Sequence, residues 1–152
     1  MKVVILADAP AALIELCGIS LIERLLRTLQ RVDVHNAVIL SSTTEALAEE
    51  LSKPSPPRRE IAFTFQRRNT GPVTIEEICG ASSEGEPLFV IPGDAVWDDR
   101  LISLLITQKE PAVLVDSDPP PSVETAISQM PMTTRGRLCG AAVLRQIGRA
   151  HV

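Results

Sequence analysis

The chain has 152 residues, of which 45% are hydrophobic and 22% are charged, and this length and composition are typical of one globular domain. A net charge of −4 and an aromatic content of only 3% argue against a nucleic-acid-binding protein, which needs a basic surface or aromatic side chains that stack on bases. No apolar run approaches the roughly 18–20 residues of a transmembrane helix, so we expect no membrane contact in this segment.

The chain opens with a strand and an amphipathic helix. Residues 3–7 are β-branched and apolar, which predicts a buried strand, and residues 20–32 have helical periodicity. Ser20 precedes this helix and Glu23 follows three residues later, a pattern that matches a capping box. The apolar positions of the helix form one stripe: Leu21, Ile22, Leu25, Leu26 and Leu29.

Two further strands and a second helix follow. Residues 37–40 predict the second strand, and residues 44–51 predict a short helix capped by Thr43 or Thr44. The alternating pattern of residues 61–66 predicts a third strand. The first half of the chain therefore alternates strand with helix.

The second half continues this alternation. Pro72 stands where the first residue of a helix running to about Cys79 would be, because proline is tolerated at the first helical position. Apolar and periodic runs then predict the remaining elements: a strand at residues 88–91, a helix at 99–107, a strand at 112–115 and a last apolar run at 138–144.

Strands that alternate with helices predict an α/β fold, here a three-layer α/β/α sandwich with a mostly parallel central sheet. No repeat or linker divides residues 1–146, so we expect one domain. Residues 147–152 begin no new element and match the translation of a sequencing adapter, so we expect a non-native tail and a fold that is incomplete at the C-terminus. A short polar tail is the alternative.

In sheets of this kind, ligands bind outside the carboxyl ends of the strands. Asp94 follows the predicted strand 88–91 through Pro92 and Gly93, and a carboxylate held there is a natural ligand for Mg²⁺ together with substrate phosphates. The alternative role for Asp94 is an ordinary turn residue before the helix. For Asp98, which directly precedes the helix 99–107, we expect a helix cap.

A second candidate segment runs from Asn69 to Thr74. Gly71 permits close backbone approach, and the helix start that follows could offer N–H groups to an anion or to a base edge. An ordinary loop-to-helix junction explains the same residues. Arg67 and Arg68 follow the strand 61–66, where they could contact a phosphate.

Several other chemistries lack their characteristic residues. The sequence has no G-x-S-x-G, C-x-x-C or phosphate-binding P-loop pattern, and its two histidines make a histidine triad or zinc site improbable. Its cysteines lie far apart at positions 17, 79 and 139, so we expect reduced thiols in a cytoplasmic protein.

Four segments together resemble a known family. They are residues 2–7 (KVVILA), 18–24 (GISLIER), 36–40 (NAVIL) and 90–94 (VIPGD). In this order they are similar to the first two thirds of a nucleotidyltransferase of the GT-A-like, nucleotide-diphosphosugar transferase fold. More narrowly, the chain resembles the N-terminal domain of bacterial fusion proteins that carry a membrane-embedded CDP-alcohol phosphatidyltransferase downstream.

The resemblance implies a reaction in which a sugar or polyol phosphate attacks the α-phosphate of a nucleoside triphosphate and releases pyrophosphate. It implies Mg²⁺ bound by Asp94, with CTP and an inositol-phosphate-like alcohol as substrates, and it assigns no catalytic residue. A full-length fusion would be anchored in the inner membrane. The resemblance also implies a set of nucleotide-binding residues: Leu6, Ala7, Asp8, Ala9, Thr70, Gly71 and Gly93.

The loop after the first strand departs from the family pattern. It normally contains a glycine-rich run, an arginine and a Pro-Lys pair, whereas residues 8–19 contain Asp8 and Glu15 and no lysine or arginine. One alternative is therefore a catalytically degenerate domain that binds a nucleotide and regulates the membrane enzyme. A glycosyltransferase of similar fold is another, because Asp116 and Asp118 have the Asp-x-Asp spacing, although a surface turn beside three prolines explains them as well.

Overall fold

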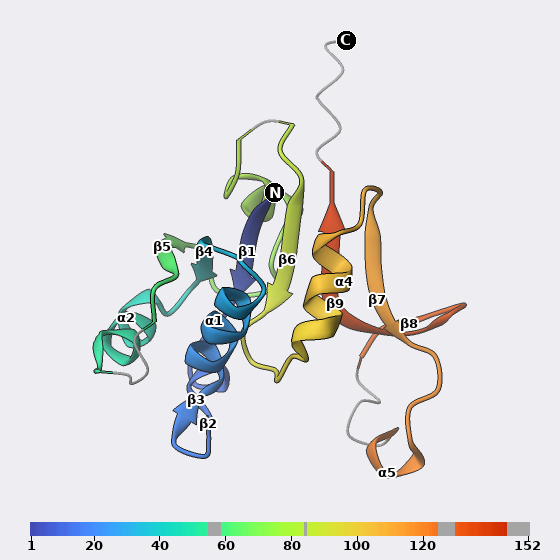
Figure 1. Cartoon of the computed structure of the whole chain (residues 1–152), viewed down its shortest axis with the longest axis horizontal. Coiled ribbons are helices and arrows are strands. Elements are labelled where there is room, and N and C mark those ends of the chain that lie inside the picture. Colours follow the sequence, from blue (N-terminus) through green and yellow to red (C-terminus); the bar gives the residue numbers. More distant parts are fainter. Residues whose placement is uncertain (55–58, 84, 125–129, 146–152) are drawn as a thin grey trace.

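The computed structural model of the chain describes residues 1–54, 59–83, 85–124 and 130–145. The strands of this part form a central sheet in the order β5-β4-β1-β6-β9-β7, with β8 also paired to β9 (Figure 1). Their bounds are β1 (Lys2–Leu6), β4 (Asn36–Ser41), β5 (Ala62–Arg67), β6 (Leu88–Pro92), β7 (Ala112–Asp116), β8 (Met132–Thr133) and β9 (Gly136–Leu144).

Strands β5, β4, β1 and β6 are parallel to one another. Ile5 in β1 lies level with Ile39 in β4 and Ile91 in β6, and all three side chains are fully buried. Strands covered on both faces have nearly continuous apolar runs, as these do. The prediction of a mostly parallel sheet is therefore confirmed for this half.

The other half of the sheet is antiparallel. Strand β9 runs against both of its neighbours, so that Val143 lies level with Phe89 in β6 and with Ala112 in β7. Gly140 in β9 has a φ of +83°, and a Cβ there would lie 2.7 Å from Cγ of Pro92. The strand thus needs glycine where it passes the end of β6.

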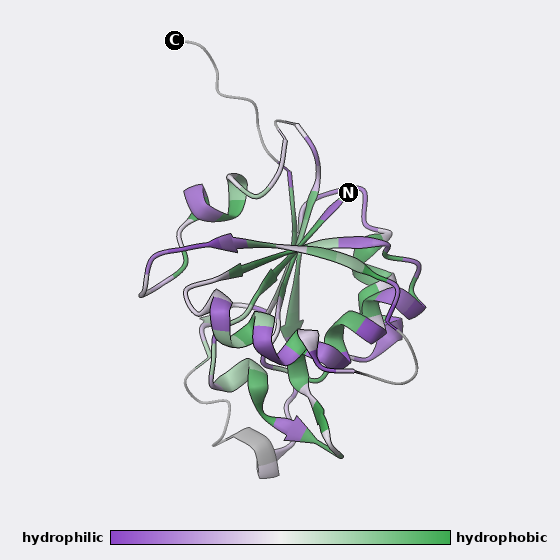
Figure 2. Cartoon of the chain, turned by 90° about the vertical axis from the view of Figure 1, so that its left-hand side faces the viewer, coloured by the Kyte–Doolittle hydropathy of each residue, from purple (hydrophilic) through white to green (hydrophobic). Residues whose placement is uncertain are grey.

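Helices cover both faces of the sheet, which gives the expected three layers (Figure 2). On one face lie α1 (Leu21–Arg31), α2 (Thr44–Ser52) and α4 (Asp99–Ile106), whose buried leucines and isoleucines pack on Val3, Ile5, Ile39, Phe89 and Ile91. On the other face, the short α3 (Ile75–Cys79) packs Ile78 against Val4, Val38, Leu40, Leu88 and Val90. The remaining short elements are η1 (Ala11–Leu13), a hairpin of β2 (Glu15–Leu16) and β3 (Ile19–Ser20), and α5 (Pro121–Glu124).

The predicted capping box at the start of α1 is wrong. Ser20 is the N-cap residue, but its side chain makes no capping hydrogen bond. The carboxylate of Glu23 is occupied by two arginines: Arg27 donates to Oε1 at 2.9 Å, and Arg59 donates to Oε2. Because both oxygens are engaged there, Glu23 does not turn back to the helix start.

Two other predicted helix starts are also corrected. Thr43 precedes α2 but does not cap it, because its hydroxyl instead accepts a hydrogen bond from the N–H of Ala9 at 2.7 Å. Pro72 is not the first residue of α3, which begins at Ile75 after the N-cap Thr74. Thr74 and Glu77 form a capping box instead. The Thr74 hydroxyl accepts the N–H of Glu77, and the Glu77 carboxylate accepts the N–H of Thr74.

Arg59 joins α1 and α2 to the edge of the sheet. Besides Glu23, it donates to the carbonyl of Leu51 at 2.8 Å, and its guanidinium lies 4.9 Å from the centre of the Phe63 ring. The side chains of Arg59 and Glu23 are only 14% and 7% exposed. The pair is thus a buried part of the fold.

Three expectations concern the chain as a whole. No helix of the described residues is long and apolar enough to span a bilayer. All three cysteines lie in the described part, and none forms a disulfide. The expected non-native tail, residues 147–152, lies outside the described residues.

Candidate functional site

The carboxyl ends of the parallel strands bring together the loops that the sequence singled out. Main-chain hydrogen bonds continue past the strand ends: the N–H of Ala7 donates to the carbonyl of Leu40, and the N–H of Gly93 donates to the carbonyl of Leu6. The loops after β1, β4 and β6 therefore leave the sheet side by side (Figure 1). This edge is where an open α/β sheet binds its ligand.

Asp8 stands at the centre of this edge, directly after β1. Its Oδ1 accepts three hydrogen bonds from the end of β4: from the backbone N–H of Ser42 at 2.7 Å, from the Ser42 hydroxyl at 2.9 Å and from the Ser41 hydroxyl at 3.1 Å. Its Oδ2 accepts from Nη2 of Arg68, at the end of β5. One carboxylate thus joins three neighbouring strand ends.

The pKa of Asp8 follows from this geometry. Partial burial raises the pKa of the carboxyl, but the hydrogen bonds from Ser42, Arg68 and Ser41 together outweigh burial and bring the pKa below its ordinary value of 3.8. Hydrogen bonds to the charged form favour that form. Asp8 is therefore a carboxylate at neutral pH.

Arg68 connects Asp8 to the second candidate segment. Its side chain is only 8% exposed, and Nη1 donates to the carbonyls of Asn69 at 2.8 Å and Gly71 at 2.7 Å. Its Nε is buried and has no hydrogen-bond partner among the described atoms. Arg67 lies elsewhere, in an exposed pair with Glu45 at 3.0 Å. The two arginines that sequence analysis grouped together thus have different environments.

The loop from Asn69 to Thr74 presents Thr70 and Gly71 to solvent. Gly71 has a φ of +116°, which glycine adopts readily, and nothing lies within 4 Å of where a Cβ would be. At the start of α3, the hydroxyl of Thr74 accepts the N–H of Glu77, and the carboxylate of Glu77 accepts the N–H groups of Thr74 and Asn69. These backbone bonds lower the pKa of Glu77.

Gly93 and Asp94 have opposite environments. Gly93 is buried, and a Cβ at this position would lie 2.8 Å from the Cβ of Ala7 and 3.1 Å from Cγ2 of Ile5, so glycine is needed for the loop to pack on β1. Asp94 is exposed, and no hydrogen bond or ion pair holds its side chain in the described part of the chain. Trp97 closes the turn by donating from Nε1 to the carbonyl of Pro92 at 2.9 Å.

The residues of this edge fit a magnesium ion only with help from a ligand. Within the described residues, no three His, Cys, Asp or Glu side chains lie close enough together to hold a metal ion. Mg²⁺ is commonly held by one or two carboxylates plus substrate phosphates. An exposed Asp94 could therefore contribute one oxygen ligand to a metal that arrives with a polyphosphate.

The other aspartates singled out by the sequence have local roles. Asp98 is the N-cap of α4, as predicted, and accepts the N–H of Arg100 at 2.8 Å. The Arg100 side chain and this backbone bond lower the pKa of Asp98 to about 2. Asp116 accepts the N–H of Asp118 at 3.1 Å, which is the bond of a surface turn.

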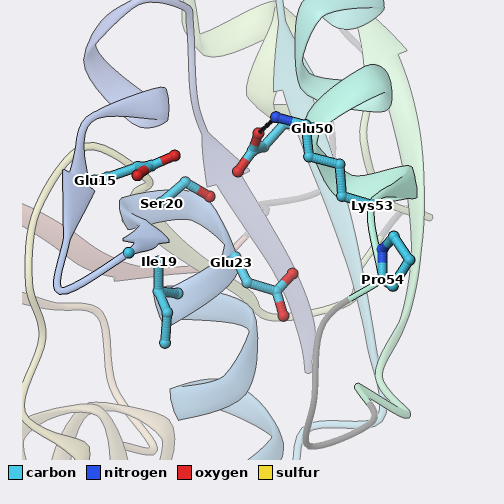
Figure 3. A pocket seen from close by; sticks show the side chains of 8 residues that line it. Glu15, Ile19, Ser20, Glu23, Glu50, Lys53 and Pro54 are labelled. Carbon is cyan, nitrogen blue, oxygen red and sulfur yellow. Dashed lines mark hydrogen bonds and ion pairs between the residues drawn. The ribbon is translucent and has the colours of Figure 1, made fainter.

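A separate pocket of about 130 Å³ lies between the start of α1 and the end of α2 (Figure 3). Glu15, Ser20, Glu23 and Glu50 are among the residues that line it, and Lys53 bonds Glu50 at 2.6 Å. Its lining carries more negative than positive charge. The pocket therefore suits a polyphosphate poorly.

Sequence reasoning missed the Asp8–Arg68 pair. The two residues are 60 positions apart, and their contact depends on β4, which lies between β1 and β5 and supplies Ser41 and Ser42. The only signal in the sequence was that residues of opposite charge directly follow two strands. Without the strand order, this signal does not identify partners.

Comparison with known proteins identifies the fold. No protein-family profile and no curated protein matches this chain. A solved structure does: a Bacillus anthracis protein assigned as a glucose-1-phosphate thymidylyltransferase, crystallised in complex with sucrose, aligns with a TM-score of 0.68 over 95% of this chain and 71% of that chain, at 16% sequence identity. At this identity the likeness shows the fold alone. The predicted nucleotidyltransferase-like α/β fold is thereby confirmed.

Proposed function

We propose that this domain is a nucleotidyltransferase that transfers the cytidylyl group of CTP to a small phosphorylated sugar or polyol, such as an inositol phosphate. An oxygen of the acceptor phosphate attacks the α-phosphorus of CTP, the bond from that phosphorus to the β-phosphate oxygen breaks, and pyrophosphate leaves. The likeness in fold to a protein assigned as a glucose-1-phosphate thymidylyltransferase supports this reaction class. The choice of CTP comes from the sequence resemblance.

The observation that carries the proposal is the position of Asp94. Its carboxylate is exposed, free of hydrogen bonds and ion pairs to the described residues, and stands at the edge where Asp8 and Arg68 also lie. Magnesium, when bound with a nucleotide, would neutralise phosphate charge and polarise the α-phosphate. Asp94 would hold that ion.

The other proposed contacts divide into backbone and side-chain roles. Ala7 and Gly93 are buried, so they would shape the floor of the nucleotide site rather than touch the nucleotide with side chains. Leu6, Asp8 and Ala9 are partly exposed beside them, and Thr70 and Gly71 are exposed on the neighbouring loop. These residues would surround the nucleotide.

The proposal includes a cellular setting. The domain would work in the cytoplasm and pass its activated CDP-alcohol to a membrane-embedded CDP-alcohol phosphatidyltransferase downstream. The sequence resemblance supports this setting. Detection of such a domain in the same gene product tests it directly.

A second candidate function is nucleotide binding without turnover, in a domain that regulates the membrane enzyme. The specific observation in its favour is the loop after β1, which has no lysine or arginine and whose Asp8 is already paired with Arg68. A polyphosphate needs converging donors and positive charge. A loop without them can hold a nucleotide and yet leave the α-phosphate unactivated.

The test is pyrophosphate release from each of the four common ribonucleoside triphosphates and dTTP, with Mg²⁺ and either inositol 1-phosphate or glucose 1-phosphate. We expect release with CTP and the inositol phosphate, and a loss of about 100-fold in Asp94→Asn, because a metal ion's charge stabilisation is worth several kcal/mol. The matched control is Asp33→Asn, which removes an exposed carboxylate at the opposite edge of the sheet.

Each outcome separates the candidates. Release that depends on Asp94 and not on Asp33 supports the transferase. Nucleotide binding without release under any of these conditions supports the regulatory domain. Release that is equally fast in Asp94→Asn would remove Asp94 from the metal site and overturn the proposal as stated.

A further inference from the structure

A polyphosphate bound at this edge needs a positive charge that the loop after β1 does not contain. Residues 8–19 contribute Asp8 and Glu15 and no basic side chain. Tight phosphate binding uses charge-assisted hydrogen bonds, most effectively from the planar fork of an arginine. The charge therefore has to come from another element.

Among the described residues, two arginines from other elements reach this loop. Arg24, on α1, donates to the carbonyl of Leu16 at 2.6 Å, in the hairpin beyond the strand end. Arg68 donates to Asp8 at the first position after β1 and also holds the carbonyls of Asn69 and Gly71. Arg68 thus stands between the two segments proposed to surround the nucleotide.

The bonding of Asp8 permits Arg68 to leave. Its Oδ1 has three donors from Ser41 and Ser42, which do not depend on the arginine. The carboxylate therefore stays stabilised when Oδ2 loses its partner. The side chain of Asp8 is 30% exposed and that of Arg68 only 8%. The guanidinium therefore has to turn away from Asp8 and toward solvent to contact an anion.

The bonding of Arg68 leaves its Nε unused. Its Nε is buried and lacks a hydrogen-bond partner in the described structure. A buried donor without an acceptor is costly, and a group rich in oxygen would relieve that cost once the guanidinium turns toward it. Its present partners are one carboxylate oxygen and two carbonyls.

We propose that Arg68 is the phosphate-binding residue of this site, and that nucleotide binding exchanges its partner from the Asp8 carboxylate to the polyphosphate. Asp8 acts as a built-in competitor that occupies the guanidinium in the absence of nucleotide. The inference rests on the proposed function only in that a nucleotide polyphosphate binds at this edge. It does not require turnover.

The exchange predicts that substitutions of the two partners of this ion pair change the affinity for polyphosphate in opposite directions. Arg68→Gln removes the phosphate ligand, so affinity falls by about tenfold or more, because hydrogen bonds to charged groups are strong. Asp8→Asn keeps an oxygen for Ser41 and Ser42 but removes the competing charge, so affinity rises several-fold. Arg67→Gln, on the neighbouring exposed arginine, serves as the matched control and leaves affinity unchanged.

The experiment is isothermal titration of the chain with three probes: tripolyphosphate, CTP and cytidine, without metal. We expect the opposite shifts for both tripolyphosphate and CTP, and none for cytidine. Parallel weakening in Asp8→Asn and Arg68→Gln would show that the pair is only structural and would overturn the proposal. Shifts for cytidine and CTP but not for tripolyphosphate would place Arg68 on the nucleoside and would overturn it too.

Arg68→Lys keeps the test decisive if Arg68→Gln folds poorly. A lysine retains the charge but cannot hold the carboxylate and two carbonyls in the geometry of a guanidinium. Tripolyphosphate binding that is partly retained in Arg68→Lys supports a phosphate contact, and complete loss of that binding in the folded Arg68→Lys protein counts against it.

The inference and the proposed function fail separately. Pyrophosphate release from CTP with tripolyphosphate binding that does not depend on Arg68 would leave the transferase standing and refute the exchange. Tripolyphosphate binding that depends on Arg68, without pyrophosphate release from any nucleotide, would support the exchange and refute the transferase.

Discussion

Two clusters in the described structure pair a carboxylate with arginine in different environments. In the first, Glu23 on α1 accepts one arginine on each oxygen, Arg27 and Arg59, and is 7% exposed. In the second, Asp8 accepts Arg68 on one oxygen, takes its other bonds from the end of β4, and is 30% exposed. The first ties helix to sheet, and the second stands at the edge proposed to bind the nucleotide.

The two carboxylates differ in their exposure and in the hydrogen bonds that remain when an arginine leaves, and this difference underlies the structural role of the first pair and the proposed binding role of the second. A buried charge that loses its partner is strongly destabilising, so the partners of Glu23 are held in place. The Asp8 carboxylate keeps three donors without Arg68, so that pair can open at lower cost. Three substitutions test this difference, in order of expected effect.

The largest effect is expected for Arg59→Ala. The substitution leaves Glu23 buried with one arginine fewer and also removes the bond to the Leu51 carbonyl and the contact with the Phe63 ring. We expect the free energy of unfolding to fall by about 3 kcal/mol, as when one partner of a buried pair is deleted. Urea denaturation followed by circular dichroism measures this loss.

Arg31→Ala is the control for Arg59→Ala. Arg31 is exposed in the last turn of α1 and bonds only the hydroxyl of Thr28 among the described contacts. We expect a much smaller fall in the free energy of unfolding than for Arg59→Ala. Equal losses for the two variants would contradict a special role for the buried cluster.

A smaller and pH-dependent effect is expected for Asp8→Asn. Because the folded state lowers the pKa of Asp8, its carboxylate adds stability that is complete above the ordinary value of 3.8 and is lost as the pH falls through the lower folded value. The difference in unfolding free energy between wild type and Asp8→Asn should therefore be constant near neutral pH and shrink below about pH 4.

Urea denaturation at pH values from 3 to 7 measures this difference. Subtracting the variant from the wild type cancels the other carboxylates, which titrate in both proteins. A difference that grows as the pH falls would mean that the folded state raises the pKa of Asp8, which contradicts the hydrogen bonding of its carboxylate.

The smallest effect is expected for Arg67→Gln. Arg67 and its partner Glu45 are 71% and 72% exposed, and exposed ion pairs contribute little because water screens them. We expect no measurable change in the midpoint of thermal unfolding. A clear fall in this midpoint would show that side-chain exposure does not distinguish the role of Arg67 from that of Arg68.

Local sequence patterns predicted most of the fold and the chain positions of the candidate loops. The apolar runs in β1, β4 and β6 indicated buried strands, and Asp98 was identified as a helix cap, because both signals depend only on near neighbours. The capping box expected from Ser20 and Glu23 failed because a distant residue, Arg59, competes for the carboxylate. Local rules could not include that competitor.

The sequence by itself determined the α/β class, the central sheet and the chain positions of the candidate loops, because periodicity and turn residues act over a few neighbouring positions. Tertiary structure alone decided which loops meet. The order β5-β4-β1-β6 brings Arg68 to Asp8 across the end of β4 and buries Gly93 on Ala7, while it leaves Asp94 exposed. Partners far apart in sequence are chosen by strand order and packing, and no local pattern encodes them.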